Sequence, residues 1–277
     1  MQVDKDIENA RLFIKGNIVD SKEYRPVKLF TGVSLKTFKE YKISGKNVLT
    51  KYNSGDEVID LLSYNGNVTC YSPNRFDEYF LYLKLAFLKE NHKDFFSYFF
   101  KDYSKNSKKY LSYDGYLSVR NNLDDKTRYF FDEIFKKNPK DALYSKLLTK
   151  VGYDYNILSM YVRYLLTNRY YEARENTNVS FVLANDNQII SLVNELYSFI
   201  NLSYGLDKID PKKMEFIMSK IDEDFKKILL ENGKIQVFLS TKEKEIEGYK
   251  KIETKAVQKS VPNDMCKKQY AYVYTNK

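Results

Sequence analysis

The sequence predicts an α/β fold, a doubly wound and mostly parallel sheet with an inserted helical cap. Residues 46–90 read as strand, turn, helix, strand, turn and helix, and a right-handed crossover makes two such strands parallel. Residues 91–178 read as helical throughout, with dense aromatic residues and no alternation. Strands then return from residue 179, so the long helical block is expected to interrupt the sheet and overhang its cleft.

The first strand and its turn carry the strongest sign of a ligand. Val48–Thr50 reads as a buried strand, and the turn Ser54-Gly55-Asp56 leads into an apolar helix. Such a turn places bare backbone N–H groups at a helix N-terminus, where they can hold the anionic end of a ligand. A Cβ at Gly55 would hold that ligand off the backbone. The alternative is a turn without a ligand, because Ser-Gly turns join strands to helices in many proteins.

The second strand, Asn67–Tyr71, ends at Ser72-Pro73-Asn74, and a helix follows from Phe76 to Glu90. In a parallel unit the tip of the second strand lies beside the first turn. A nucleoside bound at the first turn is therefore expected to reach Ser72.

Two further strand ends supply candidate residues. Val179–Leu183 is followed by Asn185-Asp186-Asn187, at the edge where a carboxylate or amide oxygen can meet an adenine amine. The alternative is a polar turn that caps a helix starting near Gln188. The strand Leu196–Leu202 ends in Asn201-Leu-Ser-Tyr204, which in this fold would face the reacting group.

The rest of the chain predicts two more strands and three helical segments. A helical lead-in ends near Pro26, and Ser34 is a plausible N-cap for a helix from 35 to 41. An amphipathic helix over 214–230 is expected to end at Asn232-Gly233. Strands are predicted at 234–240 and 270–274, with a charged loop over 242–247.

Composition excludes several classes of protein. With 277 residues, 43% apolar and 30% charged, the chain is globular and not disordered. Its apolar runs are shorter than the roughly 20 residues of a spanning helix, and Met1–Asp20 is too charged for a signal sequence. Cys70 and Cys266 are far apart, so a reducing, cytoplasmic location without a disulfide is expected. With one histidine and two cysteines, no tetrahedral zinc site is expected.

The net charge of +9 arises from 46 Lys and Arg against 37 Asp and Glu. A basic surface with interleaved tyrosines could follow nucleic acid or anionic lipid. The simpler interpretation, which we favour, is that lysine is the ordinary solvated residue of this chain. Charge balance bears on non-specific association and not on the reaction.

Several motifs resemble the S-adenosylmethionine:diacylglycerol 3-amino-3-carboxypropyl transferase family. The similarity covers about residues 28 to 277. Its best-matched segments are Val48–Asp56, Asn67–Asn74, Tyr79–Ala86, the Phe95-Phe96 and Phe99-Phe100 pairs, Tyr116–Leu123, Tyr129–Asp132, Phe199–Tyr204, Leu229–Lys234 and Tyr272–Lys277.

The resemblance implies a class I methyltransferase fold that uses S-adenosylmethionine. Its α/β domain would comprise 46–90 and 179–277, after a helical lead-in (1–45) and around a helical cap (91–178). The reaction implied is 3-amino-3-carboxypropyl (or methyl) transfer to a small-molecule or lipid hydroxyl acceptor. Alternatives are a catalytically degenerate binding protein of this fold and a nucleic-acid-modifying methyltransferase.

The same resemblance assigns roles to residues. The candidates are Ser54, Gly55 and Asp56 for the methionine end, Ser72 for the ribose, Asp186 for the adenine, and Asn201, Ser203 and Tyr204 for the reacting centre, with Asn53 and Asn74 as further cofactor-binding residues.

One departure from the family pattern concerns the ribose. Ser72 stands where the family has an aspartate, and serine holds a ribose diol less strongly than a carboxylate does. Ser72→Asp is therefore expected to tighten cofactor binding by about ten-fold or more. Asp77 or Glu78, in the next helix turn, could reach over instead.

Overall fold

A computed structural model gives the structure of residues 2–17, 21, 23–28, 42–90, 109–137, 146–148, 168–176, 178–203, 211–239, 246–255 and 268–276. The predicted helix at 35–41, Tyr204 and Cys266 lie outside these described residues.

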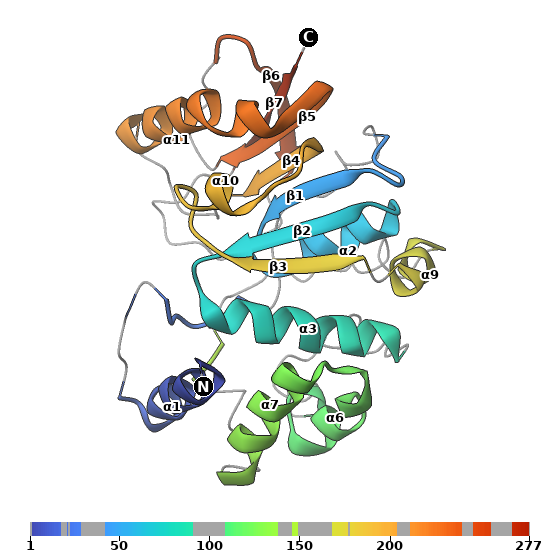
Figure 1. The fold of residues 1–277 in the computed structure, drawn as a ribbon, viewed down its shortest axis with the longest axis vertical. Coiled ribbons are helices and arrows are strands. Elements are labelled where there is room, and N and C mark those ends of the chain that lie inside the picture. Colours follow the sequence, from blue (N-terminus) through green and yellow to red (C-terminus); the bar gives the residue numbers. More distant parts are fainter. Residues whose placement is uncertain are drawn as a thin grey trace.

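The centre of the molecule is a seven-stranded sheet in the order β3-β2-β1-β4-β5-β7-β6 (Figure 1). The first five strands along the chain are parallel, and β7 alone runs against its neighbours. The prediction of a mostly parallel, doubly wound sheet is confirmed. The strands are β1 (Asn47–Lys51), β2 (Asn67–Ser72), β3 (Val179–Leu183), β4 (Tyr197–Ser203), β5 (Leu229–Leu239), β6 (Lys250–Lys255) and β7 (Lys268–Thr275).

The β1-α2-β2-α3 unit follows the predicted pattern closely. α2 (Asp56–Ser63) and α3 (Arg75–Lys89) each begin just after a strand ends. β1 pairs with β2 in parallel from Asn47↔Asn67 to Lys51↔Tyr71. The carboxyl ends of both strands therefore lie at one edge, next to the first turns of both helices.

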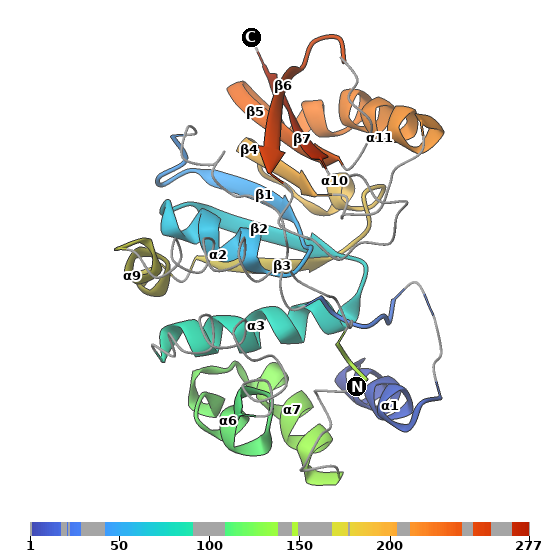
Figure 2. The same ribbon diagram turned by 180° about the vertical axis from the view of Figure 1, so that it is seen from behind.

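Helices cover both faces of the sheet. One face packs Val48, Val68 and Phe199 against α2 and α3, and the other packs Leu49, Ile200 and Ile235 beneath α10 (Ile189–Leu192) and α11 (Pro211–Glu223). In the view from behind, α2 lies in front of β2 and α3 lies below β3, whereas α11 lies beside β5 and β7 at the opposite end of the sheet (Figure 2). Alternate strand residues face opposite sides, and each side is buried by its own helices.

The segment before β5 differs from the sequence prediction. The helix expected over 214–230 ends at Glu223, a 3₁₀ turn (η3, Phe225–Ile228) follows, and β5 begins at Leu229. The Asn232-Gly233 pair does not end a helix, because it lies within β5. Asn232 adopts a φ of 59°, and the pairing with β4 is irregular between Tyr197 and Phe199. A bulge, and not a helix end, uses the permissive Asn-Gly pair.

The strand β6 was not predicted. Its sequence, Lys-Lys-Ile-Glu-Thr-Lys, is mostly charged, and it forms the outer edge of the sheet against β7. Lysine-rich sequence is typical of edge strands, where charge prevents further pairing. Because such a sequence lacks alternating apolar residues, a search for hydrophobic alternation does not find the strand.

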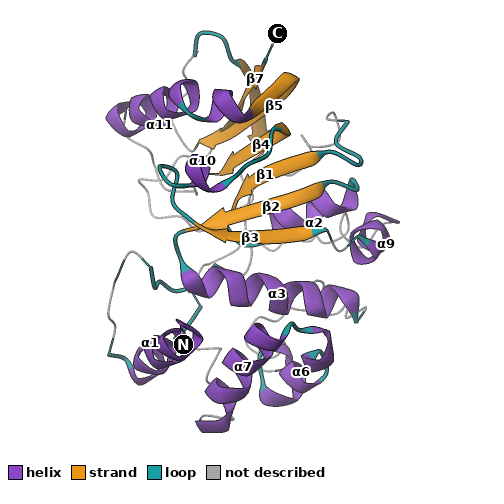
Figure 3. Ribbon diagram, viewed as in Figure 1, coloured by secondary structure: helices purple, strands orange, loops and turns teal. Residues whose placement is uncertain are grey.

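The described part of 91–178 consists of helices and turns, and its β-structure is limited to one bridge residue, Leu148, which pairs with Val27. It contains α6 (Tyr113–Leu117), the turn η2 (Arg120–Asn122), α7 (Asp125–Lys137) and α9 (Asn168–Glu175). α6 and α7 lie on the far side of α3 from the sheet, with α7 beside α1 (Gln2–Lys15). α9 lies near the amino ends of the strands (Figures 1 and 3). The division into lead-in, α/β domain and overhanging cap stays a prediction. None of the described helices is long and apolar enough to cross a bilayer.

Candidate functional site at the carboxyl edge of the sheet

The topology brings the predicted site residues to one edge of the sheet. Residues 53–56 follow β1, Ser72 and Asn74 close β2, Asp186 follows β3, and Asn201 and Ser203 lie at the end of β4. These four strands are neighbours in the order β3-β2-β1-β4. Crevices at this edge are where open parallel sheets bind ligands.

The backbone N–H groups of the β1–α2 turn are occupied. Those of Asn53, Ser54 and Gly55 all donate to Glu57 Oε1, at 2.7, 3.3 and 3.1 Å. Glu57 lies in the first turn of α2 and is 2% exposed. The expectation of bare N–H groups at this turn is wrong, because the chain supplies its own carboxylate to them.

A buried ion pair supports the turn from below. Lys84 of α3 pairs with Asp56, and its ammonium also donates to the carbonyl oxygen of Ser54 at 3.2 Å. The side chains of Lys84 and Asp56 are both fully buried. Burial lowers the pKa of Lys84, and the adjacent Asp56 carboxylate opposes that shift. Asp56 and Ser54 therefore hold the turn together and have no surface to offer a ligand.

Gly55 is required for the conformation of the turn and for its packing. Its φ is 84°, in the left-handed region that favours glycine. A Cβ there would lie 3.2 Å from Leu81 Cδ1 and 3.4 Å from Tyr52 Cε2. The space beside Gly55 is therefore filled by side chains of the protein, including Leu81 of α3. The glycine permits this packing, and the sequence argument that it clears space for a ligand does not hold.

A carboxylate, that of Asp77, lies beside the end of β2 although Ser72 replaces the expected aspartate there. Ser72 Oγ donates to Asp77 Oδ2 at 2.7 Å, and Asn74 Nδ2 donates to Asp77 Oδ1 at 2.8 Å. Asp77 is in the first turn of α3 and reaches back to the strand end, whereas Glu78 turns away to an ion pair with Lys126. Of the two acids considered from the sequence, the structure selects Asp77.

Both polar atoms of the Asn74 side chain form hydrogen bonds within the protein. Its amide oxygen accepts from the backbone N–H of Arg25 at 3.0 Å and of Phe76 at 3.4 Å. Its amide nitrogen donates to the Arg25 carbonyl as well as to Asp77. Asn74 thus caps α3 and fixes Asp77 in place.

Burial changes the protonation of Asp77. Loss of hydration raises its pKa from 3.8 to about 7, and the nearby Glu57 carboxylate adds to this rise. The hydrogen bonds from Ser72 and Asn74, and the charge of Lys28, act in the opposite direction. A second carboxylate at position 72 would lie directly beside Asp77, and like charges disfavour ionisation. We therefore expect Ser72→Asp to destabilise the site, contrary to the expectation from sequence alone.

Asp186 lies at the same edge but on the other face. Its carboxylate accepts from the Tyr71 hydroxyl at 2.9 Å and pairs with Lys51 Nζ at 2.7 Å. Lys51 is the last residue of β1, and it pairs with Tyr71, the penultimate residue of β2. The side chains of Lys51 and Asp186 remain 20% and 24% exposed, so this cluster is open to solvent. Asn185 closes the polar turn before α10, since its side-chain oxygen accepts from the backbone N–H groups of Asn187 and Gln188. Among the described residues, no side chain caps α10 itself, whose N-cap residue is Gln188.

The residues predicted near the reacting centre are only partly described. Asn201 is 1% exposed and donates to Thr50 Oγ1 at 3.0 Å, and it accepts from Gln236 at 3.5 Å. These three side chains form a buried polar row across β1, β4 and β5. Ser203 is placed at the end of β4 opposite Phe238, but its side chain, like Tyr204, lies outside the described part.

Sequence reasoning missed Glu57 and Lys84, and both had a signal. Ser54-x-x-Glu57 fits the capping-box pattern, in which the glutamate reaches back to backbone N–H groups. Lys84 stands three or four residues from Phe80, Leu81, Phe87 and Leu88, which places it on the buried face of its helix. A lysine on such a face needs an acidic partner.

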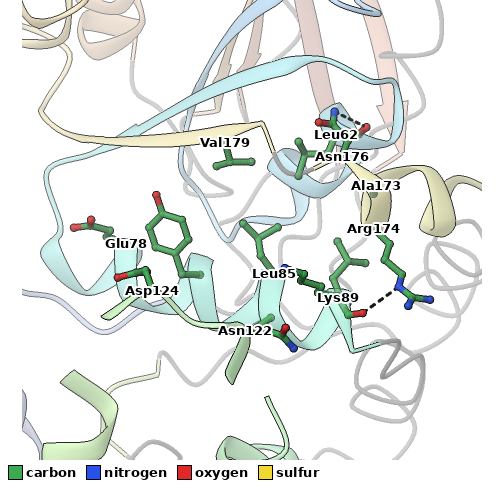
Figure 4. Close-up of a pocket in the computed structure, with 13 residues that line it drawn as sticks. Leu62, Glu78, Leu85, Lys89, Asn122, Asp124, Ala173, Arg174, Asn176 and Val179 are labelled. Carbon is green, nitrogen blue, oxygen red and sulfur yellow. Dashed lines mark hydrogen bonds between the residues drawn. The ribbon is translucent and has the colours of Figure 1, made fainter. Parts of the chain in front are cut away.

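A separate hollow lies away from this edge (Figure 4). It has a volume of about 370 Å³ and runs along α3 to the start of β3 and to α9. Leu62, Leu85, Ala173 and Val179 form its apolar lining, and Arg174 Nε donates to the Lys89 carbonyl at its rim. Among its lining residues only Glu78 was considered for the site, as an alternative acid for the ribose, and it pairs with Lys126 instead.

The order 3-2-1-4-5-7-6 with β7 reversed defines the class I methyltransferase fold. No protein-family model and no curated protein matches the chain. Solved structures that resemble it include the rRNA methyltransferase AviRa from Streptomyces viridochromogenes, at 9% identity and a TM-score of 0.40, over 84% of this chain and 77% of that one. An rRNA methylase from Streptococcus thermophilus is similar at 7% identity and a TM-score of 0.35, over 85% and 90% of the two chains. Likenesses this distant do not bear on the reaction, and the fold assignment rests on the strand order.

Proposed function

We propose that this chain is an S-adenosylmethionine-dependent transferase. The observation that carries the proposal is the carboxylate of Asp77, fixed by Ser72 and Asn74 at the tip of β2. That point lies beside the β1–α2 turn in a sheet of the class I methyltransferase order. A carboxylate accepts both hydroxyls of a ribose, which a serine alone does poorly.

The remaining roles follow from position along the edge. Asp186, partly exposed at the end of β3, would accept from the adenine amine, and the β1–α2 turn would lie against the amino-acid end of the cofactor. S-adenosylmethionine brings its own leaving group as a sulfonium, so the protein mainly aligns a nucleophile with one S–C bond. Ser203, the last residue of β4, and Tyr204, the next residue in the sequence, are the candidates for orienting the acceptor.

The group transferred and its acceptor are the finer part of the proposal. The family resemblance favours the 3-amino-3-carboxypropyl group, or methyl, and a small-molecule or lipid hydroxyl as acceptor. Incubation with cofactor labelled either in the methyl group or in the carboxypropyl chain distinguishes the two transfers by which label reaches the acceptor.

A binding protein that has lost the reaction is the second candidate. The observation that favours it is the engagement of Ser54, Asp56 and Asn201 in buried interactions within the protein. Such a protein would bind the cofactor and transfer neither label. Nucleic-acid binding is supported only by the net charge of +9. If it occurs, its affinity should fall steeply as the salt concentration rises.

Thermal unfolding with and without S-adenosylmethionine tests the proposal. Ligand at 100 times its dissociation constant stabilises the native state by about 2.7 kcal/mol. We expect this stabilisation in the wild type and in Glu78→Gln, whose acid faces Lys126, and its loss at the same ligand concentration in Asp77→Asn. Equal stabilisation of Asp77→Asn would show that the ribose is held elsewhere, and no stabilisation of any of the three proteins would reject the cofactor.

A further inference from the structure

Within the described part of the chain, Glu57 forms hydrogen bonds through one of its two carboxylate oxygens. Oε1 accepts three backbone N–H groups, whereas Oε2 is buried and has no hydrogen-bond partner in the described part of the chain. A buried carboxylate oxygen without a donor is costly. One acceptor of a fixed, buried carboxylate is therefore left without a donor among the described residues.

The surroundings of this oxygen favour a cation. The hydroxyl of Tyr52, 7% exposed, also lacks a partner among the described residues. Tyr52 interacts electrostatically with Glu57 and Asp77, and these two acids interact with each other. Lys84, the cation coupled to Glu57, is held by Asp56 and by the Ser54 carbonyl. The region is thus rich in acceptors and acids.

We propose that Glu57 binds the primary ammonium of the ligand's amino-acid end, and that the β1–α2 turn does not bind the ligand's carboxylate. The inference rests on the proposed function, since it concerns one end of the same ligand. The three N–H groups that would have received a carboxylate are already used by Glu57. A second carboxylate placed there would also face the charge of Glu57, and like charges in a buried site repel strongly.

Three thioether ligands that share adenosine separate the two groups. S-adenosylhomocysteine has the ammonium and the carboxylate, 5′-(3-aminopropylthio)-5′-deoxyadenosine has the ammonium alone, and 5′-methylthioadenosine has neither. We expect calorimetric titration to give the first two ligands similar affinities. 5′-Methylthioadenosine should bind about ten-fold or more weakly, as expected for a lost hydrogen bond between charged groups.

The variant Glu57→Gln tests the residue itself. The glutamine oxygen can still accept the three N–H groups, but an amide NH₂ replaces Oε2 and opposes an ammonium. We expect the two ammonium ligands to lose about ten- to hundred-fold in affinity, while 5′-methylthioadenosine binds as before and so reports a folded site. Glu78→Gln makes the same chemical change on α3, beside the partly exposed Lys126, and should leave all three affinities unchanged.

Each contrary result has a distinct meaning. If loss of the carboxylate alone weakens binding by ten-fold or more, the turn recognises the carboxylate and the inference is overturned. It is also overturned if Glu57→Gln leaves the ammonium ligands unaffected. If all three ligands bind the wild type equally, the proposed cofactor site stands and only this inference fails. If none binds, the proposed function and the inference fail together.

Discussion

At the scale of single residues, Lys84 is the side chain on which the β1–α2 turn depends. Its partner Asp56 is fully buried, and a buried charge left without its partner destabilises a protein by about 3–5 kcal/mol. We expect Lys84→Met to lower the free energy of unfolding by that amount, measured by urea denaturation.

The Lys126–Glu78 pair provides the matched control. It likewise joins a lysine to a carboxylate, here that of Glu78, but the two side chains are 46% and 20% exposed. Exposed pairs contribute about 0–1 kcal/mol, so Lys126→Met should change stability little. Equal effects of the two substitutions would contradict the structural role of Lys84. Adding Asp56→Asn to Lys84→Met should recover part of the loss, because it removes the unpaired charge.

Asp77 should make stability depend on pH. Its pKa in the folded protein is about 7, against an ordinary value of 3.8. Between these values the native state holds a proton that the unfolded state has released, so stability falls as pH rises from about 4 to about 7. Above pH 7 both states are ionised and the loss is complete.

The comparison of the wild type with Asp77→Asn isolates this effect. Asparagine resembles the protonated acid, so the variant should gain stability relative to the wild type, by on the order of a few kcal/mol, between pH 5 and pH 8. Urea denaturation at the two pH values measures the difference. A difference that is the same at both values would show that Asp77 does not titrate in this range.

At the scale of elements, the β1–α2 turn combines backbone strain with close packing at Gly55. Gly45 also has a left-handed φ, of 69°, but a Cβ there would meet nothing within 4 Å. Gly45→Ala therefore measures the conformational cost alone, about 1–2 kcal/mol. Gly55→Ala adds the approach of 3.2 Å to Leu81, and we expect it to destabilise more in urea denaturation. An equal loss in both variants would mean that Leu81 moves aside freely.

The elements also show what a sequence can predict. The β1-α2-β2-α3 unit was predictable because alternating burial, turns and helical spacing agree throughout residues 46–90. β5 and β6 were predicted less well, because their local sequences do not specify the whole strand and pairing with neighbouring strands determines their structure. The Asn232-Gly233 pair suits a helix end or a bulge equally, and only the pairing with β4 selects the bulge. The charged strand β6 is held by its partner β7.

The site was predictable in place but not in its contacts. Strand order alone puts Asn53 to Asp56, Ser72 and Asp186 at one edge. The direction in which α3 leaves β2 determines which acid lies beside Ser72. In the structure Asp77 points toward Ser72, whereas Glu78 points toward Lys126. Glu57 was missed because its role depends on the side chain folding back onto its own turn.

At the scale of the whole molecule, two helical layers and the sheet leave the carboxyl edge as the place where β1, β2, β3 and β4 end together. Most buried charged groups described here, including Asp56, Glu57, Asp77 and Lys84, gather at this edge or just beneath it. Buried ionisable groups with shifted pKa values are typical of functional sites. The hollow along α3 lies apart from them and is lined largely by apolar side chains.

The structure of the complex with S-adenosylhomocysteine is the most direct test of the central claim, that Asp77 at the tip of β2 holds the ribose of an adenosyl cofactor. We predict that both ribose hydroxyls lie within hydrogen-bond distance, roughly 2.5–3.0 Å, of the Asp77 carboxylate. A ligand bound in the hollow along α3, or one at the sheet edge whose ribose does not contact Asp77, would contradict the account.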